Sequence, residues 1–280
     1  MNAPDLTQLP PPEVVEALDF ETILQVHRAD LLARYPEAAA VIDLESEPLN
    51  KLLQAHAYRE LLYRQRVNEA ARAHLLAFAT GADLDHKAAF YGLTRLAGES
   101  DERLRARVQL RIKSLAGNGT REAYELTAMT ASQNVRDARA TQPFPGRVHL
   151  LLWCHDAAQA EATLATVLAA INADDGRPLG VPVTVALARA RAINITAAIE
   201  REAGTPADLA QRLVVTLADA LAAYARLGRD VPRSWITARL HTAQVAAVRF
   251  PDPAAPAEST PLDDDEYPTL GVVHIEDVTK

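Results

Sequence analysis

The stretch LNKLLQAHAYRELLYRQRVNEAARAHLLAFA, residues 49–79, runs without a proline or glycine between Pro48 and Gly81. Pro48 suits the first turn of a helix, where its missing N–H costs nothing, and Gly81 suits a C-terminal cap. The sequence therefore predicts one helical rod of roughly 45 Å, at about 1.5 Å per residue. Such a rod is longer than a compact domain of the N-terminal hundred residues needs.

The apolar residues of this rod lie on more than one side. At about 100° per residue they form one face, a nearly opposite face and a side between them. One face consists of Leu49, Leu53, Val67, Ala71 and Phe78. The nearly opposite face consists of Tyr58, Leu62 and Leu76, and the side between them of Leu61 and Leu75. A surface helix buries one stripe, whereas two separated stripes need cover on both sides. The chain's own short helices would cover one stripe, and a second chain the other.

A polar set accompanies the apolar stripe. Glu60, Arg64 and Asn68 are four residues apart, and Glu before Arg at this spacing contributes about 0.3 kcal/mol when exposed. A polar residue in a helical seam also sets the register of a bundle. The pattern is compatible with a solvated face of a monomeric helix and with a partner-bound bundle. The predicted partner-interface residues are Leu49, Leu53, Tyr58, Glu60, Leu61, Leu62, Arg64, Val67, Asn68, Ala71, Leu75 and Phe78.

Shorter helices are predicted on both sides of the rod. Asp19 caps a helix that ends before Pro36, and a short helical stretch follows over 37–44. Ser100 and Thr120 are good N-caps for two further helices, which extend to about residues 116 and 132. The proline-rich first dozen residues are expected to be extended or docked on a partner.

The periodicity changes after Pro143. Residues 147–154 (RVHLLLWC) form a buried apolar run typical of a strand, and an amphipathic helix follows over 157–171. The odd positions of 181–187 and 193–199 are apolar, with Arg189 and Arg191 between them, which predicts two strands in series with a hinge at the arginines. The further elements predicted are a helix from Thr205 to Gly228, a short helix capped by Ser234, a strand over 244–250, a polar loop over 251–268 and a last strand over 272–278.

These elements predict an α+β fold class. A mostly helical N-terminal region with a long bundle-forming helix (1–90) and a helical linker region (91–142) precede two small α/β domains. The first, over 143–190, is β-α-β; the second, over 191–280, is β-α-α-β with a C-terminal extension.

Composition narrows the class of protein. Of 280 residues 49% are hydrophobic, enough for a sizeable core, and the net charge of −8 argues against a nucleic-acid groove. Cys154 is the single cysteine, so no internal disulfide forms and a reducing compartment fits. The N-terminus lacks the features of a signal peptide, and no run approaches the roughly eighteen apolar residues of a membrane span. A cytoplasmic product without a membrane anchor is expected.

No catalytic constellation is present in the sequence. It has no phosphate-binding glycine loop, no nucleophile elbow and no zinc-protease motif. Asp83, Asp85 and His86 are interpreted as a helix–helix loop with capping acids, and residues 263–266 (DDDE) as a solvated charge run. Cys154, in an apolar strand, is interpreted as inert core. We therefore predict no enzyme and no catalytic, cofactor-binding or metal-binding residue.

Several blocks of this sequence resemble the baseplate assembly protein J family, wedge subunits of contractile phage tails and of R-type pyocins. The blocks are LDFETIL (18–24), residues 45–85, YGLTRL (91–96), ESDERLRARV (99–108), RPLGVPVTV (177–185) and residues 227–250. The resemblance covers nearly the whole chain.

The resemblance implies a mechanical function. Two such chains and a second wedge protein would form a heterotrimer through the N-terminal helices, and six-fold repetition would form a ring around the hub and tube. The C-terminal domains would link neighbouring wedges. The ring would hold the sheath extended and then trigger its contraction, with no cofactor, nucleic acid or membrane involved. The particle would assemble in the bacterial cytoplasm.

A mechanical switch needs rigid pieces joined by few hinges. The candidate hinge residues are Gly117, Gly119, Pro143, Gly146, Arg189 and Arg191.

Two alternatives stay open. A monomeric enzyme would have its site between the two α/β domains, in a pocket lined by ionisable groups with perturbed pKa values. A stand-alone cytoplasmic adaptor would use the same rod, and neighbouring genes for sheath, tube or spike proteins would distinguish it from a baseplate subunit.

Overall fold

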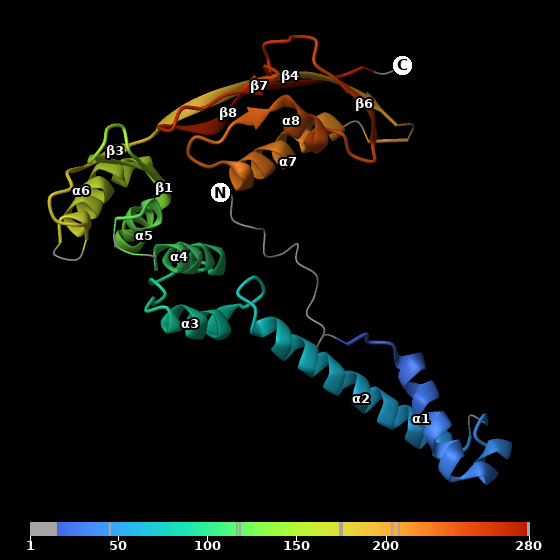
Figure 1. Ribbon diagram of the computed structural model, residues 1–280. Helices are drawn as coiled ribbons and strands as arrows, with labels where there is room; N and C mark the ends of the chain where they lie inside the picture. Colours follow the sequence, from blue (N-terminus) through green and yellow to red (C-terminus); the bar gives the residue numbers. More distant parts are fainter. Residues whose placement is uncertain are drawn as a thin grey trace. The chain divides into compact units, whose positions relative to one another are not determined.

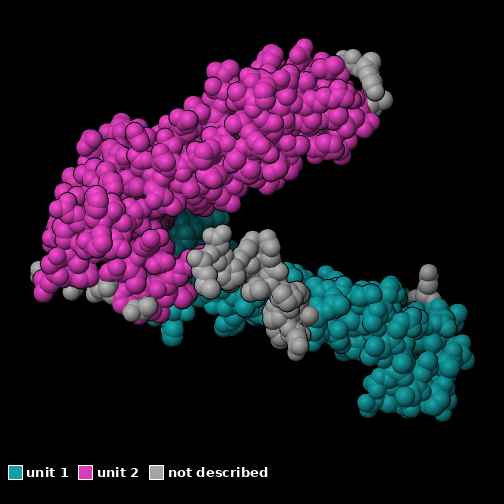
Figure 2. Space-filling model, turned by 45° about the horizontal axis from the view of Figure 1, so that its top comes forward, with its two compact units in different colours: residues 1–108 teal, residues 109–280 magenta. Residues whose placement is uncertain are grey.

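The protein divides into two compact units, residues 1–108 and 109–280 (Figure 2). The structure, a computed structural model, describes residues 16–44, 46–115, 117, 119–173, 176–202, 204–206 and 208–278. The predicted α+β class with a helical N-terminal region is confirmed. The expectation of an extended or docked N-terminal segment concerns residues outside those described, and the four-part domain division remains a prediction.

Unit 1 is helical. Its elements are α1 (Phe20–Arg34), the 3-10 helix η2 (Pro36–Ala40), α2 (Pro48–Ala73), α3 (Gly81–Phe90) and α4 (Asp101–Ser114), the last of which crosses into unit 2. Asp19 caps α1 as predicted, since its side chain accepts hydrogen bonds from the N–H groups of Glu21 and Thr22. Helix α1 lies along the N-terminal part of α2 (Figure 1).

The predicted rod is too long. Helix α2 ends at Ala73, so its 26 residues span about 39 Å, and residues 74–78 form turns. Side chains from elsewhere in the chain bind three of the carbonyls that follow the helix. Arg105 donates to the carbonyls of Leu76 and Ala79, both at 2.8 Å, and Lys87 to that of His74 at 2.5 Å. These contacts replace the i to i+4 bonds at the carbonyls of His74 and Leu76, whereas the carbonyl of Leu75 still accepts the N–H of Ala79 at 2.9 Å.

Gly81 begins α3 rather than capping α2. The loop predicted around Asp83, Asp85 and His86 is therefore a helix. Asp85 contacts Arg95 Nε at 2.7 Å, and the same guanidinium contacts Asp101 at 2.7 Å. Asp101 also accepts the N–H of Gly81, and these two bonds lower its pKa. An ion-pair network thus joins α3 to the start of α4.

Unit 2 begins with a three-stranded sheet under two helices. Its elements are α5 (Arg121–Ala131), β1 (Val135–Thr141), β2 (Val148–Cys154), the 3-10 helix η3 (Ala157–Gln159), α6 (Ala160–Ile171) and β3 (Val183–Leu187). The strand order is β1-β2-β3, with β1 antiparallel and β3 parallel to β2. Strand β1 falls in the region predicted to be a helical linker, so that prediction is wrong over 135–141.

The second sheet of unit 2 has the order β6-β4-β8, with α7 and α8 on one face (Figure 1). Its elements are β4 (Arg189–Arg201), α7 (Leu209–Tyr224), α8 (Arg233–Leu240), β6 (Val245–Arg249) and β8 (Glu266–Asp277), with a small β5-β7 pair (Val231–Pro232 and Ser259–Thr260) beside them. The core contains the apolar residues of β4 and four leucines of α7.

Three boundaries differ from the sequence prediction. Two strands in series are confirmed, but they separate at Ala188, and Arg189 and Arg191 lie within β4, paired with β8. Strand β8 begins at Glu266, inside the predicted loop, because its first residues pair with the start of β4. Helix α8 begins at Arg233, so Ser234 lies in its first turn and is not the cap.

Among the described residues, no helix is long and apolar enough to cross a membrane.

Candidate functional site: the faces of helix α2

One face of α2 is covered by the chain itself. Ala57 is fully buried against Ile23 and Leu24 of α1, and Leu53 and Leu61 pack at the edges of this contact. The small side chain at position 57 lets the two helix backbones approach closely, since a larger residue would push α1 away. We call Leu53, Ala57 and Leu61 the covered face.

The predicted polar set contacts residues of this chain. Asn68 binds the backbone of Glu16 twice: its Oδ1 accepts the N–H at 2.9 Å and its Nδ2 donates to the carbonyl at 2.8 Å. Arg64 lies 2.5 Å from Glu60, as the spacing predicted, and His27 of α1 lies 2.7 Å from the same carboxylate. The hydrogen bond from Arg64, followed by that from His27, lowers the pKa of Glu60. The set thus holds α1 and the segment before it on α2.

Two other faces of α2 are exposed. The first, which we call the arginine face, consists of Leu52, Arg59, Tyr63, Arg66 and Val67; the second, the Tyr58 face, consists of Lys51, Tyr58, Leu62, Gln65 and Glu69. At about 100° per residue, the centres of these two faces and of the covered face are roughly 120° apart around the helix. Large apolar side chains grouped on an exposed helix surface are typical of an interaction site.

The predicted interface residues differ in solvent exposure: some are exposed, one is buried and the others are partly buried. Tyr58, Leu62, Val67 and Phe78 are exposed, and Asn68 is buried. The remaining residues, Leu49, Leu53, Glu60, Leu61, Arg64, Ala71 and Leu75, are partly buried. Leu75 and Phe78 lie after the end of α2, so they belong to the following turns and not to its faces. The partner contacts of this set stay a prediction.

Sequence reasoning missed Leu52 and Tyr63, which are 55% and 69% exposed. The helical-wheel positions of both residues were available from the sequence. The face of α2 that α1 covers was not, because it depends on packing at Ala57, a residue with no apolar signal of its own.

The candidate hinges have varied surroundings. Gly117, Gly119 and Gly146 have positive φ, and a side chain on Gly119 would come within 2.9 Å of Pro178. Pro143 is exposed, and Arg189 and Arg191 are exposed within β4. Hinge motion at any of these residues remains a prediction.

The two sheets of unit 2 meet where the enzyme alternative places its site, and packed side chains occupy this junction. Trp153 of β2 stacks on Tyr267 of β8 with ring centroids 4.3 Å apart, and Leu151 packs with Ala225 and Leu227. Strand β2 is buried on both faces because its odd-numbered residues face this junction while its even-numbered residues face α5 and α6.

Charged side chains of β1 complete this junction. Asp137 accepts the N–H of Leu227 at 2.9 Å, and Arg139 donates to the carbonyl of Leu227 at 2.8 Å and contacts Asp264 at 2.5 Å. Arg136 lies 3.8 Å above the ring of Trp153. These bonds join β1 to the segment after α7 and to the loop before β8, which explains why a strand rich in charge escaped prediction.

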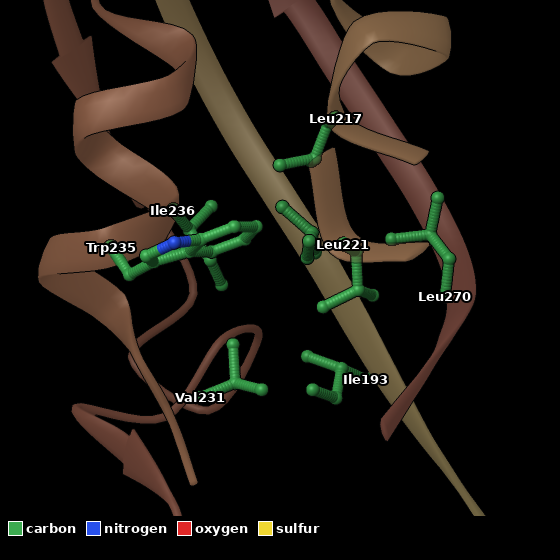
Figure 3. Close-up of a pocket in the computed structure, with 8 residues that line it drawn as sticks. Ile193, Leu217, Leu221, Val231, Trp235, Ile236 and Leu270 are labelled. Carbon is green, nitrogen blue, oxygen red and sulfur yellow. The ribbon is translucent and has the colours of Figure 1, made fainter. Parts of the chain in front are cut away.

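A narrow apolar gap, too small to hold a water molecule, lies between the β6-β4-β8 sheet and helices α7 and α8 (Figure 3). Leu217 and Leu221 of α7, Ile193 of β4 and Trp235 of α8 point toward one another there. All eight lining residues are apolar or aromatic, so the gap offers no acid, base or metal ligand.

Burial shifts the pKa values of two carboxyl groups, one on α5 and one on β1. Burial raises the pKa of Glu125 to about 7, although its Oε1 accepts the N–H of Ala140. Burial also raises the pKa of Asp137. No group of three or more His, Cys, Asp or Glu residues suited to a metal ion occurs in the part of the chain that the structure describes.

This sequence matches a protein-family model and a baseplate protein of a phage. A family model described as the Baseplate J-like N-terminal domain matches residues 45–100, which include α2 and α3. Baseplate protein J of Escherichia phage P2 is 39% identical over 274 residues, which cover 90% of this chain and 91% of the relative.

Proposed function

This chain belongs to the baseplate J family, and we propose that it is a structural, non-enzymatic wedge subunit in the baseplate of a contractile tail or a tail-like bacteriocin particle. The observation that carries the proposal is the pair of exposed faces on α2, each of which carries large apolar side chains. In water these faces cost free energy, about 25 cal/mol for each Å² of apolar surface left uncovered. A protein that works inside an assembly recovers this free energy when its partners bind.

The three faces of α2 support a particular stoichiometry. One face carries the chain's own α1, which leaves two faces for two further chains. A heterotrimer of two copies of this chain and a second wedge protein satisfies that geometry. A six-fold ring of heterotrimers would then surround the hub and tube and contact the sheath.

Unit 2 supports the linking function. Its two α/β domains are joined by the stacked Trp153–Tyr267 pair and by the bonds of Asp137 and Arg139, so they suit a rigid arm between neighbouring wedges. Triggering would require the ring to open at hinges outside such rigid bodies. Assembly would take place in the bacterial cytoplasm, and the product would be part of the tail particle.

The first experiment tests heterotrimer formation. The chain is co-expressed with candidate baseplate proteins from the same source, and the mass of the purified complex is measured by light scattering. Leu62→Asp and Val67→Asp should abolish the complex, because each places a charge in an apolar contact. Val215→Asp, at an exposed valine of α7, is the control and should leave the complex intact. A wild-type chain that stays monomeric beside every co-expressed protein would refute the proposal.

A second experiment tests whether heterotrimer formation and ring formation depend on different parts of the chain. A chain ended after α4, at residue 115, keeps every helix of the N-terminal part. We expect it to form the heterotrimer but not closed rings in electron micrographs. Closed rings made from this truncated chain would show that unit 2 does not link wedges.

A further inference from the structure

The two exposed faces of α2 differ in charge. Arg59 and Arg66 are both exposed and lie seven residues apart, so they point the same way on the arginine face. His56 is exposed three residues before Arg59, on the side of Leu52 and Tyr63. The Tyr58 face instead carries one cation and one anion, Lys51 and Glu69.

No described acid neutralises the arginine face. Glu60 is held by Arg64 and His27, and Glu69, three residues after Arg66, accepts a hydrogen bond from Gln65 on the Tyr58 face. The chain as a whole has a net charge of −8, so the positive charge of this helix face is opposite in sign to the net charge of the chain. Such a face fits a partner of opposite charge, because complementary potentials guide association and like charges oppose it.

We propose that the arginine face of α2 binds an acidic amphipathic helix from a different protein chain, and not a second copy of α2. The apolar side chains of Leu52, Tyr63 and Val67 would pack against the apolar face of the partner helix. Carboxylates spaced about seven residues apart on that helix would pair with Arg59 and Arg66. The proposal rests on the proposed function, since it identifies the chemistry of one of the two partners.

A second copy is a poor occupant of this face. If two arginine faces met, four guanidinium groups would gather along one seam, and like charges in an interface are destabilising. The Tyr58 face, with its balanced charges, carries no such penalty. The charge pattern thus separates the two exposed faces by the kind of chain that each accepts.

Zero-length cross-linking tests the proposal in assembled particles. Arg59→Lys and Arg66→Lys keep both charges and add amines that a carbodiimide couples to a carboxylate in direct contact. Baseplates are assembled with the full-length double variant, treated with carbodiimide and analysed by mass spectrometry. The expected links join the introduced lysines to aspartate or glutamate residues of a different baseplate protein, within a helical segment. Native Lys51, on the Tyr58 face, is the internal control.

Three results would overturn the proposal. The introduced lysines would link to a second copy of this chain, or to acids within residues 1–15 of the same chain, or to nothing while other lysines of the particle react. Each of these outcomes leaves the proposed function standing, because the chain is still present in the baseplate. A chain absent from all baseplates would instead refute the proposed function.

A charge-reversal pair gives a second readout. Arg59→Glu with Arg66→Glu should reduce heterocomplex formation at low salt by about tenfold or more, because it replaces attraction by repulsion. Lys51→Glu changes the charge on the other face and should have little effect. Circular dichroism of the free chains verifies that α2 remains helical. Normal heterocomplex formation by the double variant would contradict the proposal.

Discussion

Helices α2 and α7 have leucine-rich sequences and opposite environments. In α7 the buried residues are Leu209, Leu213, Leu217 and Leu221, which all face the sheet of the second α/β domain. In α2, which is ten residues longer, the buried residues are Asn50, Ala57 and Asn68, while large apolar side chains lie outside.

The difference shows how each helix is stabilised. A buried leucine contributes roughly 1.5–3 kcal/mol, so α7 derives its stability from its own domain. Helix α2 has one face under α1 and two exposed faces, so we propose that other chains complete its stabilisation. A helix that folds with its own domain and a helix that awaits partners can therefore be distinguished by which of their apolar residues are buried.

The largest expected effect is in α7. Leu217→Asp places a charge among Ile193, Ile195 and Trp235 and should cost more than about 4 kcal/mol, enough to unfold the second α/β domain. Urea unfolding followed by far-ultraviolet circular dichroism measures the loss. Val215→Asp, on the exposed side of the same helix, should change the free energy of unfolding by no more than about 0.5 kcal/mol. Equal losses for both variants would remove the basis of the comparison.

A smaller effect is expected at the covered face of α2. Ala57→Leu overpacks the contact with α1 and should cost about 1–3 kcal/mol. Faster amide hydrogen exchange in α1 would report the displacement. Ala70→Leu, at an exposed alanine of the same helix, is the control. Unchanged exchange in the Ala57→Leu variant would mean that α1 does not lie on α2.

The stability of unit 2 should depend on pH through Glu125. Its pKa is raised by burial to about 7, above the ordinary value near 4.5, so the folded state holds the proton more tightly than the unfolded state. The contribution of this group is fully present below about pH 4.5 and is lost as pH rises through about 7. Relative to Glu125→Gln, the wild type should lose on the order of 2 kcal/mol between pH 5 and pH 8. Glu161→Gln, on the outside of α6, is the control; parallel pH profiles for wild type and Glu125→Gln would exclude this mechanism.

The smallest effect on the isolated chain is expected at the exposed faces. Tyr63→Ser or Leu62→Ser should alter the free energy of unfolding by about 0.5 kcal/mol or less, since neither residue is packed in the isolated chain. The same changes should weaken binding to partners. A loss of several kcal/mol from the isolated chain would show that these side chains are already covered.

Much of this architecture could be predicted because its signals are local. The caps Asp19 and Thr120 begin helices as expected, and the apolar run of β2 is a strand. The end of α2 could not be predicted, because it depends on Arg105 and Lys87, which are distant in sequence. Strand β1 was missed because its charged residues bind the neighbouring domain, so it lacks the alternation of a half-buried strand.

The surroundings of the predicted interface residues differ between the two predicted stripes. Tyr58 and Leu62 of one stripe share an exposed face, whereas the other stripe is divided, with Leu53 beside α1 and Val67 exposed on the arginine face. Which residues belong to the covered face depends on where α1 packs, and that is a long-range contact. Leu53 and Leu61 therefore lie under α1, while Leu52 and Tyr63, which were not selected, lie outside.

Thiol labelling of the Tyr58 face tests the central claim most directly. Leu62→Cys in a Cys154→Ala background gives one cysteine, whose labelling rate is measured in the dilute monomer and in assembled baseplates. Exposed apolar faces that only other chains cover predict rapid labelling in the monomer and strong protection in the baseplate. Slow labelling in the monomer, or equal rates in both states, would contradict the account.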